Sequence, residues 1–157
     1  MKKRIAKILL GMALLATFTV KANDALSLNY SYGNFPDKKG IPGLTVQYMH
    51  VPDSLGFITS ATFLRKTYDE NIVSKYASLL AGPVYKLNSR LYIFSMVGVS
   101  ASSKMKDSQA NELYGPAISA GVGISLSDRL GINVGYQTSH NDDGSLNVFY
   151  GGLGYSF

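Results

Sequence analysis

The chain has 157 residues, a length typical of one compact domain. Five of its fifteen basic residues lie among the first 21 residues, and the other ten are balanced by ten acidic residues, so the net charge of +5 does not indicate a nucleic-acid partner. The absence of cysteine excludes stabilisation by disulfides.

The first 22 residues have the pattern of a secretory signal peptide. Four basic residues among the first seven precede an apolar run from Ile8 to Val20, and the small residue Ala22 follows shortly after. The run has 13 residues, fewer than the roughly 20 that a membrane-spanning helix needs. We expect cleavage between Ala22 and Asn23, which leaves residues 23–157 as the folded domain.

The dominant signal after this segment is a two-residue alternation of bulky apolar and small polar side chains. At its start Leu26, Leu28 and Tyr30 alternate with Ser27 and Asn29, which places the two sets on opposite faces of a β-strand. The pattern recurs along the chain and predicts eight strands. In chain order the segments are 25–33, 43–50, 55–64, 75–87, 91–102, 116–126, 130–137 and 146–157.

The predicted connections alternate in kind. Short polar or proline-containing turns are expected at 51–54, 88–90 and 127–129. Longer and more charged loops are expected at 34–41, 67–74, 103–113 and 139–145. Short turns at one end, longer loops at the other and an even number of strands are typical of an outer-membrane barrel.

The composition of the two faces distinguishes a membrane barrel from a soluble one. A soluble eight-stranded barrel would fill its interior with the bulky apolar set and expose the small polar set to water. That polar set contains almost no charge, whereas soluble surfaces are rich in charge. We therefore predict an all-β fold, an eight-stranded antiparallel up-and-down transmembrane β-barrel, with the apolar set facing lipid and the small polar set filling the lumen. Pro83 and Pro116 lie inside predicted strands, so we expect a bulge or a position outside the hydrogen-bond ladder at each.

The aromatic residues are expected to form two girdles at the membrane boundaries. The alternative is that tyrosine is simply favourable in strands. The girdle near the termini is predicted to contain Tyr48, Phe57, Tyr85, Tyr155 and Phe157, and the opposite girdle Tyr32, Phe63, Tyr136 and Phe149.

Three stretches resemble the Ail/Lom/OmpX family of small outer-membrane proteins: residues 55–63, residues 75–88 with the pattern AGP-x-Y-basic-x-N, and residues 114–126. The similarity extends over residues 23–157 and includes the terminal GLGYSF. It implies an eight-stranded antiparallel barrel without an open channel in the outer membrane of a Gram-negative bacterium, with extracellular loops and both termini in the periplasm. It also implies a C-terminal signal for the outer-membrane assembly machinery, which Leu153, Tyr155 and Phe157 match.

The resemblance implies a role in surface attachment, host-cell interaction or serum (complement) resistance, with host surface or complement-regulatory proteins as partners. The competing interpretation is a structural barrel that stabilises the outer leaflet by binding lipopolysaccharide. Basic residues at the loop end would attract the phosphates of lipopolysaccharide or sulfated host glycans, or would only contact lipid headgroups at the rim. These residues are Lys38, Lys39, Arg65, Lys66, Lys75, Lys104 and Lys106.

The sequence gives little support for catalysis, a metal or a cofactor, and we expect none of them. His50 and His140 are the only histidines, and there is no cysteine to complete a transition-metal site. Ser139 and His140 are the candidates for a lipid A-modifying hydrolase, but adjacent strand residues point to opposite faces. A solvated loop tip is the simpler interpretation. Gly121 and Gly123 lie inside a strand with no helix to bind phosphate, so we attribute them to close packing in a small lumen.

Overall fold

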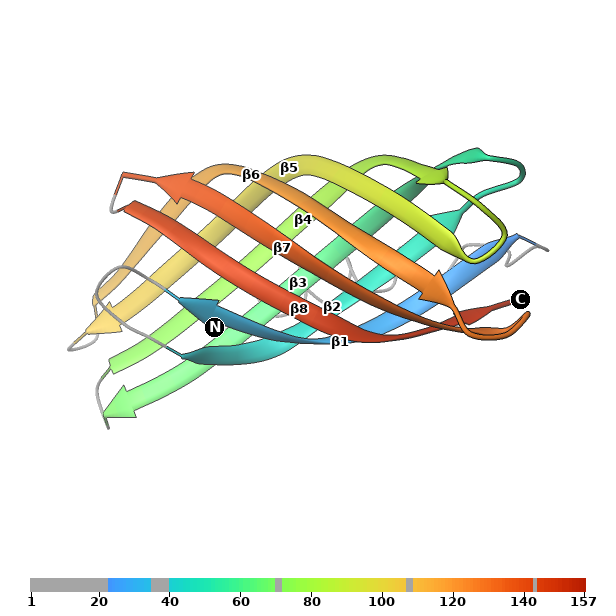
Figure 1. The fold of residues 1–157 in the computed structure, drawn as a ribbon. Coiled ribbons are helices and arrows are strands. Elements are labelled where there is room, and N and C mark those ends of the chain that lie inside the picture. Colours follow the sequence, from blue (N-terminus) through green and yellow to red (C-terminus); the bar gives the residue numbers. More distant parts are fainter. Residues whose placement is uncertain (1–22, 35–39, 70–71, 107–108, 143) are drawn as a thin grey trace.

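The chain folds into a closed antiparallel barrel of eight strands in simple sequential order. The computed structural model describes residues 23–34, 40–69, 72–106, 109–142 and 144–157. The last strand pairs with the first and closes the sheet (Figure 1), which confirms the predicted fold class. In the described residues, no helix has the length and apolar character needed to cross a membrane. The strands are β1 Asp24–Asn34, β2 Ile41–His50, β3 Leu55–Asp69, β4 Ile72–Lys86, β5 Leu91–Lys106, β6 Gln109–Ser125, β7 Leu130–Asn141 and β8 Gly144–Ser156.

The two ends of the barrel differ. The short turns at 51–54, 87–90 and 126–129 lie at the same end as Phe157, and we name it the proximal end. The other four connections lie at the opposite end, on the left of Figure 1, which we name the distal end. The alternation of turns is therefore the one that the sequence predicts.

The bulky apolar side chains face outward, as predicted. Leu28, Val97 and Leu153 are 58%, 67% and 62% exposed, although all three lie in the middle of strands. Residues on the opposite face of the strands, among them Asn29 and Ser100, are buried in the lumen. An exposed surface of leucine, valine and isoleucine is stable only against another apolar phase, which for a barrel is lipid.

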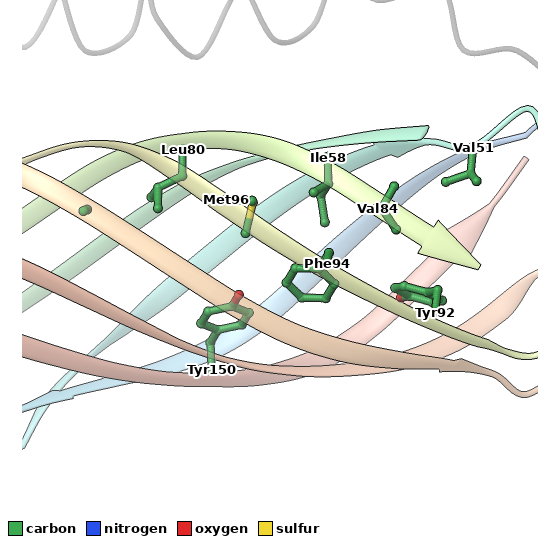
Figure 2. Close-up of a cluster of buried hydrophobic side chains, with 9 residues drawn as sticks. Val51, Ile58, Leu80, Val84, Tyr92, Phe94, Met96 and Tyr150 are labelled. Carbon is green, nitrogen blue, oxygen red and sulfur yellow. The ribbon is translucent and has the colours of Figure 1, made fainter. Parts of the chain in front are cut away.

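The lumen differs from the prediction of small polar groups alone. Large apolar side chains also fill it, in two clusters. The cluster in Figure 2 contains Val51, Ile58, Leu80, Val84, Tyr92, Phe94, Met96, Ala117 and Tyr150. The second cluster, toward the distal end, contains Ile41, Leu64, Tyr76, Leu146 and Val148.

Glycines create the space for these rings. A Cβ atom on Gly123 would lie 2.0 Å from Cζ of Tyr92, and one on Gly135 would lie 2.3 Å from Cζ of Tyr150. Both distances are well below van der Waals contact, and each glycine is the ladder partner of its tyrosine, so the glycines of one strand leave room for aromatic rings of the neighbouring strand. Close packing in the lumen is the role that the sequence predicts for the glycines inside the strands.

The central strands are longer than predicted. β3 and β4 have 15 residues each, β5 has 16 and β6 has 17. The prediction of loops at 67–74, 103–113 and 139–145 is therefore wrong for most of these residues, which belong to strands. β3 pairs with β4 as far as Asp69 and Ile72, and β5 pairs with β6 as far as Lys106 and Gln109. Polar residues beyond the lipid need not alternate with apolar ones, so the sequence pattern ends before the strands do.

Both prolines lie where the prediction places them, outside a hydrogen-bond ladder on one side. The pairing of β4 with β5 is interrupted between the Ala81–Val97 and Val84–Phe94 pairs, where Gly82 and Pro83 lie, and the register is the same before and after. Pro116 pairs with Val99 on one side, while the ladder between β6 and β7 begins only at Ala117. The missing N–H of each proline is thus tolerated without a bulge.

Candidate functional site

Half of the barrel wall continues beyond the closed cylinder at the distal end. The ladder between β2 and β3 ends at the Gly43–Leu64 pair, next to Pro42, and the ladder between β6 and β7 ends at the Ala117–Ser139 pair, next to Pro116. Beyond these pairs β3, β4, β5 and β6 pair only with one another and no longer with β2 or β7. We name this part the projecting sheet; it comprises residues 65–69, 72–75, 103–106 and 109–112.

The projecting sheet begins where the lipid-facing band ends. On β3 the outward positions from Leu55 to Phe63 are apolar except for Thr59, and they span nine residues, which is close to the 9–11 residues of a membrane-spanning strand. Arg65 is the next outward position, and residues 65–69 carry the strand about 16 Å further at roughly 3.3 Å per residue. A surface presented beyond the lipid boundary is accessible to ligands in the adjoining solvent.

One outward row of the projecting sheet brings two cations together. Arg65 on β3 lies directly opposite Lys75 on β4, and the row continues through Ser103 on β5 to Glu112 on β6. Both cations are exposed. Directly opposed side chains in an antiparallel pair have Cβ atoms about 4.5–5.5 Å apart, a spacing at which like charges destabilise the pair.

No carboxylate of the described residues forms an ion pair with Arg65 or Lys75. The carboxylate in their row, Glu112, accepts a hydrogen bond of 3.0 Å from the Tyr114 hydroxyl on its own strand. Two strand spacings, about 10 Å, separate β6 from β4, so Glu112 is poorly placed to neutralise Lys75. An anion bound between Arg65 and Lys75 would remove the repulsion between them.

The other predicted cations do not share this face. Lys66 and Lys104 both pair with Ser74 and therefore lie on the opposite face of the projecting sheet. The Lys66 ammonium lies 5.0 Å from the centre of the Tyr68 ring, a cation–π contact. Lys106 ends β5, and Lys38 and Lys39 lie outside the described residues. The structure thus divides the predicted basic group between two faces.

Aromatic side chains lie on the outward face at both ends, where the girdles are expected. Tyr136 and Phe149 form a distal pair with ring centres 4.9 Å apart. Tyr155 and Phe157 form a proximal pair at 5.1 Å. The side chains of Leu153, Tyr155 and Phe157 are all exposed on the outside. The backbone N–H of Phe157 donates to the carbonyl of Asp24 at 2.9 Å, so the chain end is fixed at the barrel seam.

The candidate hydrolase residues are separated. Ser139 is buried in the lumen, whereas His140 is exposed on the outside. His140 Nδ1 instead lies 3.0 Å from Oγ of Ser145, its partner across the ladder. Among the described residues there is no group of three histidines or acids that could hold a metal ion.

A polar contact at the proximal rim is not predicted by the strand pattern. Oδ1 of the buried Asp24 lies 2.5 Å from Nδ1 of His50, and the two residues are a ladder pair of β1 and β2. The His50 ring also packs against Phe57, with centres 5.6 Å apart. The sequence carries a signal for this contact: Asp24 directly precedes the first predicted strand, and His50 is the last residue of the second.

Comparisons with known proteins agree with this architecture. A family model described as the outer membrane protein beta-barrel domain matches residues 9–157. The virulence membrane protein PagC of Salmonella typhimurium is 29% identical over 160 residues, which cover 85% of this chain and 86% of PagC. Outer membrane protein X of Enterobacter cloacae is 26% identical over 163 residues, which cover 94% of this chain and 90% of that protein.

Solved structures show the same fold. The crystal structure of Ail, the attachment invasion locus protein of Yersinia pestis, has a TM-score of 0.71 at 21% identity and covers 87% of this chain and 100% of its own. A second Ail structure, in complex with the heparin analogue sucrose octasulfate, has a TM-score of 0.73 at 22% identity and covers 85% of this chain and 96% of its own.

Proposed function

Because this chain belongs to the family of outer-membrane β-barrel domains that includes Ail and OmpX, we propose that it attaches the bacterial surface to polyanionic ligands through its distal end. In this proposal residues 1–22 are removed on export, the proximal end with both termini faces the periplasm, and the projecting sheet faces the outside. The ligand class is sulfated host glycan, and adhesion or serum resistance follows from coating the cell surface with such molecules.

The paired cations Arg65 and Lys75 are the observation that carries the proposal. They are exposed, directly opposed across a ladder and without a carboxylate partner in the described residues. A guanidinium presents a planar set of donors that matches two oxygens of a sulfate or phosphate group, and the neighbouring ammonium adds a point charge. The pair therefore offers more affinity for a multivalent anion than isolated rim lysines do.

The comparisons support the ligand class without extending to individual contacts. One solved structure of Ail contains a heparin analogue, a densely sulfated sugar. PagC, the relative at 29% identity, is described as a virulence membrane protein. A polyanion-binding surface protein associated with virulence is consistent with both.

The proposal is tested with cells that express the protein and with immobilised heparin as the probe. The variant Arg65→Glu with Lys75→Glu should bind at least tenfold more weakly, because two attractions become repulsions and about 1.4 kcal/mol already corresponds to a tenfold change. The matched control is Lys86→Glu with Arg90→Glu, which makes the same change in net charge at the proximal end. Equal losses in both variants, or unchanged binding of the first, would contradict the proposal.

The second candidate function, stabilisation of the outer leaflet through lipopolysaccharide phosphates, uses the same pair of cations. Arg65 lies just beyond the apolar band of β3, at the height at which a basic side chain reaches lipid headgroups. One expression experiment distinguishes the two functions. Cells of a non-adherent, serum-sensitive host that gain adhesion or serum survival on expression favour attachment, whereas a gain only in resistance to detergent favours the structural role.

A further inference from the structure

The wall opposite Arg65 and Lys75 carries a different surface at the same end. β7 and β8 lie four positions from β3 and β4 in the closed order of eight strands, so they form the opposite wall. Three successive outward ladder pairs at their distal ends present uncharged polar and aromatic side chains. We name them the neutral patch: Tyr136 opposite Phe149, Thr138 opposite Asn147, and His140 opposite Ser145.

Hydrogen bonds hold the neutral patch in one arrangement. The amide oxygen of Asn147 accepts from the Tyr136 hydroxyl at 2.8 Å and from Thr138 Oγ1 at 3.0 Å. An amide oxygen has two lone pairs, so both are used and the Asn147 NH₂ group is left with two donors that no hydrogen bond in the described residues uses. His140 is fixed through Nδ1 by Ser145, which leaves Nε2 for another partner.

The neutral patch also has a flat apolar component. Phe149 is 57% exposed and packs against the Tyr136 ring at 4.9 Å between centres. An exposed ring beside fixed amide and imidazole groups combines apolar contact with directional hydrogen bonds. Sugar rings have matching chemistry, since they carry hydroxyl groups around faces of C–H bonds. The patch has no lysine, arginine or carboxylate of its own, so it offers no fixed positive charge to a phosphate or sulfate.

Its position identifies the source of the sugar. The neutral patch follows directly after the lipid-facing residues Ile132 and Val134 on β7 and Leu153 on β8, and it faces sideways, along the plane of the membrane. The molecules at that height around an outer-membrane barrel are the headgroups of the surrounding lipid. We propose that the neutral patch binds uncharged sugar rings in the core saccharide of lipopolysaccharide, and that the barrel therefore holds its lipid neighbours through sugars on one wall and anionic groups on the other. The proposal goes beyond polyanion attachment, which concerns the opposite wall.

The test uses protein extracted from outer membranes and reconstituted in phosphatidylcholine vesicles. The probes are lipid A, which carries phosphates but no core saccharide, and rough lipopolysaccharide, which carries both. The readout is the midpoint temperature of unfolding, followed by mobility on unboiled gels. We expect the core saccharide to raise the midpoint of the unchanged protein beyond the value in lipid A.

The variant Asn147→Leu with His140→Phe removes both free hydrogen-bonding groups from exposed positions. It should lose more than half of the increment due to the core saccharide and keep the increment due to lipid A. Thr59→Leu, an outward polar change on β3 that lies outside both surfaces, is the matched control and should keep both. Arg65→Glu with Lys75→Glu should show the reverse pattern, a smaller lipid A increment with the core increment intact, so failure of one proposal is distinguishable from failure of the other.

Two results would overturn the inference. One is a core increment that is absent from the unchanged protein or fully retained by the Asn147→Leu, His140→Phe variant. The other is an equal rise on adding a soluble neutral oligosaccharide such as maltoheptaose to vesicles without lipopolysaccharide, because the sugar would then be taken from the solvent instead of the membrane.

Discussion

Gln137 offers a quantitative test of how the lumen is stabilised. Its side chain is fully buried, and Nε2 donates to the Tyr76 hydroxyl at 2.7 Å and to Ser78 Oγ at 2.8 Å on the opposite wall. Its Oε1 accepts a longer bond of 3.4 Å from Thr62 Oγ1. One side chain thus connects β7 with β3 and β4 through the lumen.

The substitution Gln137→Leu keeps the volume and removes both donors. Each buried polar group that loses its partner costs about 1–3 kcal/mol, so the loss at Tyr76 and Ser78 comes to about 2–6 kcal/mol. That is a large part of the roughly 5–15 kcal/mol by which a domain is stable. Adding Tyr76→Phe and Ser78→Ala to the leucine variant removes the unpaired groups themselves, and should recover most of the stability.

The measurement is urea unfolding of the reconstituted barrel, followed by tyrosine emission because the chain has no tryptophan. With a slope of about 1–3 kcal/mol per molar urea, a loss of about 3 kcal/mol lowers the midpoint by about 1–3 M. Thr59→Leu, a polar-to-leucine change on the outward face of β3, is the control and should have little effect. A triple variant no more stable than Gln137→Leu would refute the reasoning.

Two further predictions concern packing and assembly. Gly135→Ala should lower the free energy of unfolding by about 1–3 kcal/mol, because the new methyl group forces the Tyr150 ring to move. The control is Gly151→Ala, whose Cβ would have its nearest neighbour at 3.3 Å and which should cost less than about 0.5 kcal/mol in the same urea assay. Equal losses in the two variants would count against the clash. Phe157→Ser should lower the amount of folded barrel in outer membranes severalfold, as measured on unboiled gels. The yield of refolding in vesicles should stay within about twofold, because the Phe157 side chain is exposed. A normal amount of folded barrel in cells would argue against an assembly signal.

The outward half of the structure could be predicted from the sequence because one physical requirement governs it. Lipid favours apolar side chains at outward positions whatever their neighbours are, so Leu26, Leu28 and Tyr30 identify their face without knowledge of the fold. The inward half follows a different requirement. Tyr92 fits only because Gly123 lies beneath it on another strand, and the sequence of one strand does not show which residue lies beneath it.

The same distinction applies to the candidate site. The charges of Arg65 and Lys75 are visible in the sequence, and their location at the distal end follows from the order of turns. Their direct opposition depends on the register of β3 and β4. The sequence pattern alone predicts a loop at 67–74 beside both residues, because polar strands beyond the lipid carry no alternating apolar pattern. The neutral patch escaped notice for the same reason, since its residues extend past the apolar part of β7.

Pro42 and Pro116 have a further consequence for variation at the cell surface. Because each lies next to the last pair that joins this half of the wall to its neighbours, the residues of β3, β4, β5 and β6 distal to them pair only with one another. Residues added in matched pairs to both arms of the β3–β4 or β5–β6 hairpin would lengthen the exposed part and leave every pairing inside the membrane untouched. The length of the part that extends beyond the lipid can thus change without a change in the cylinder that spans the membrane.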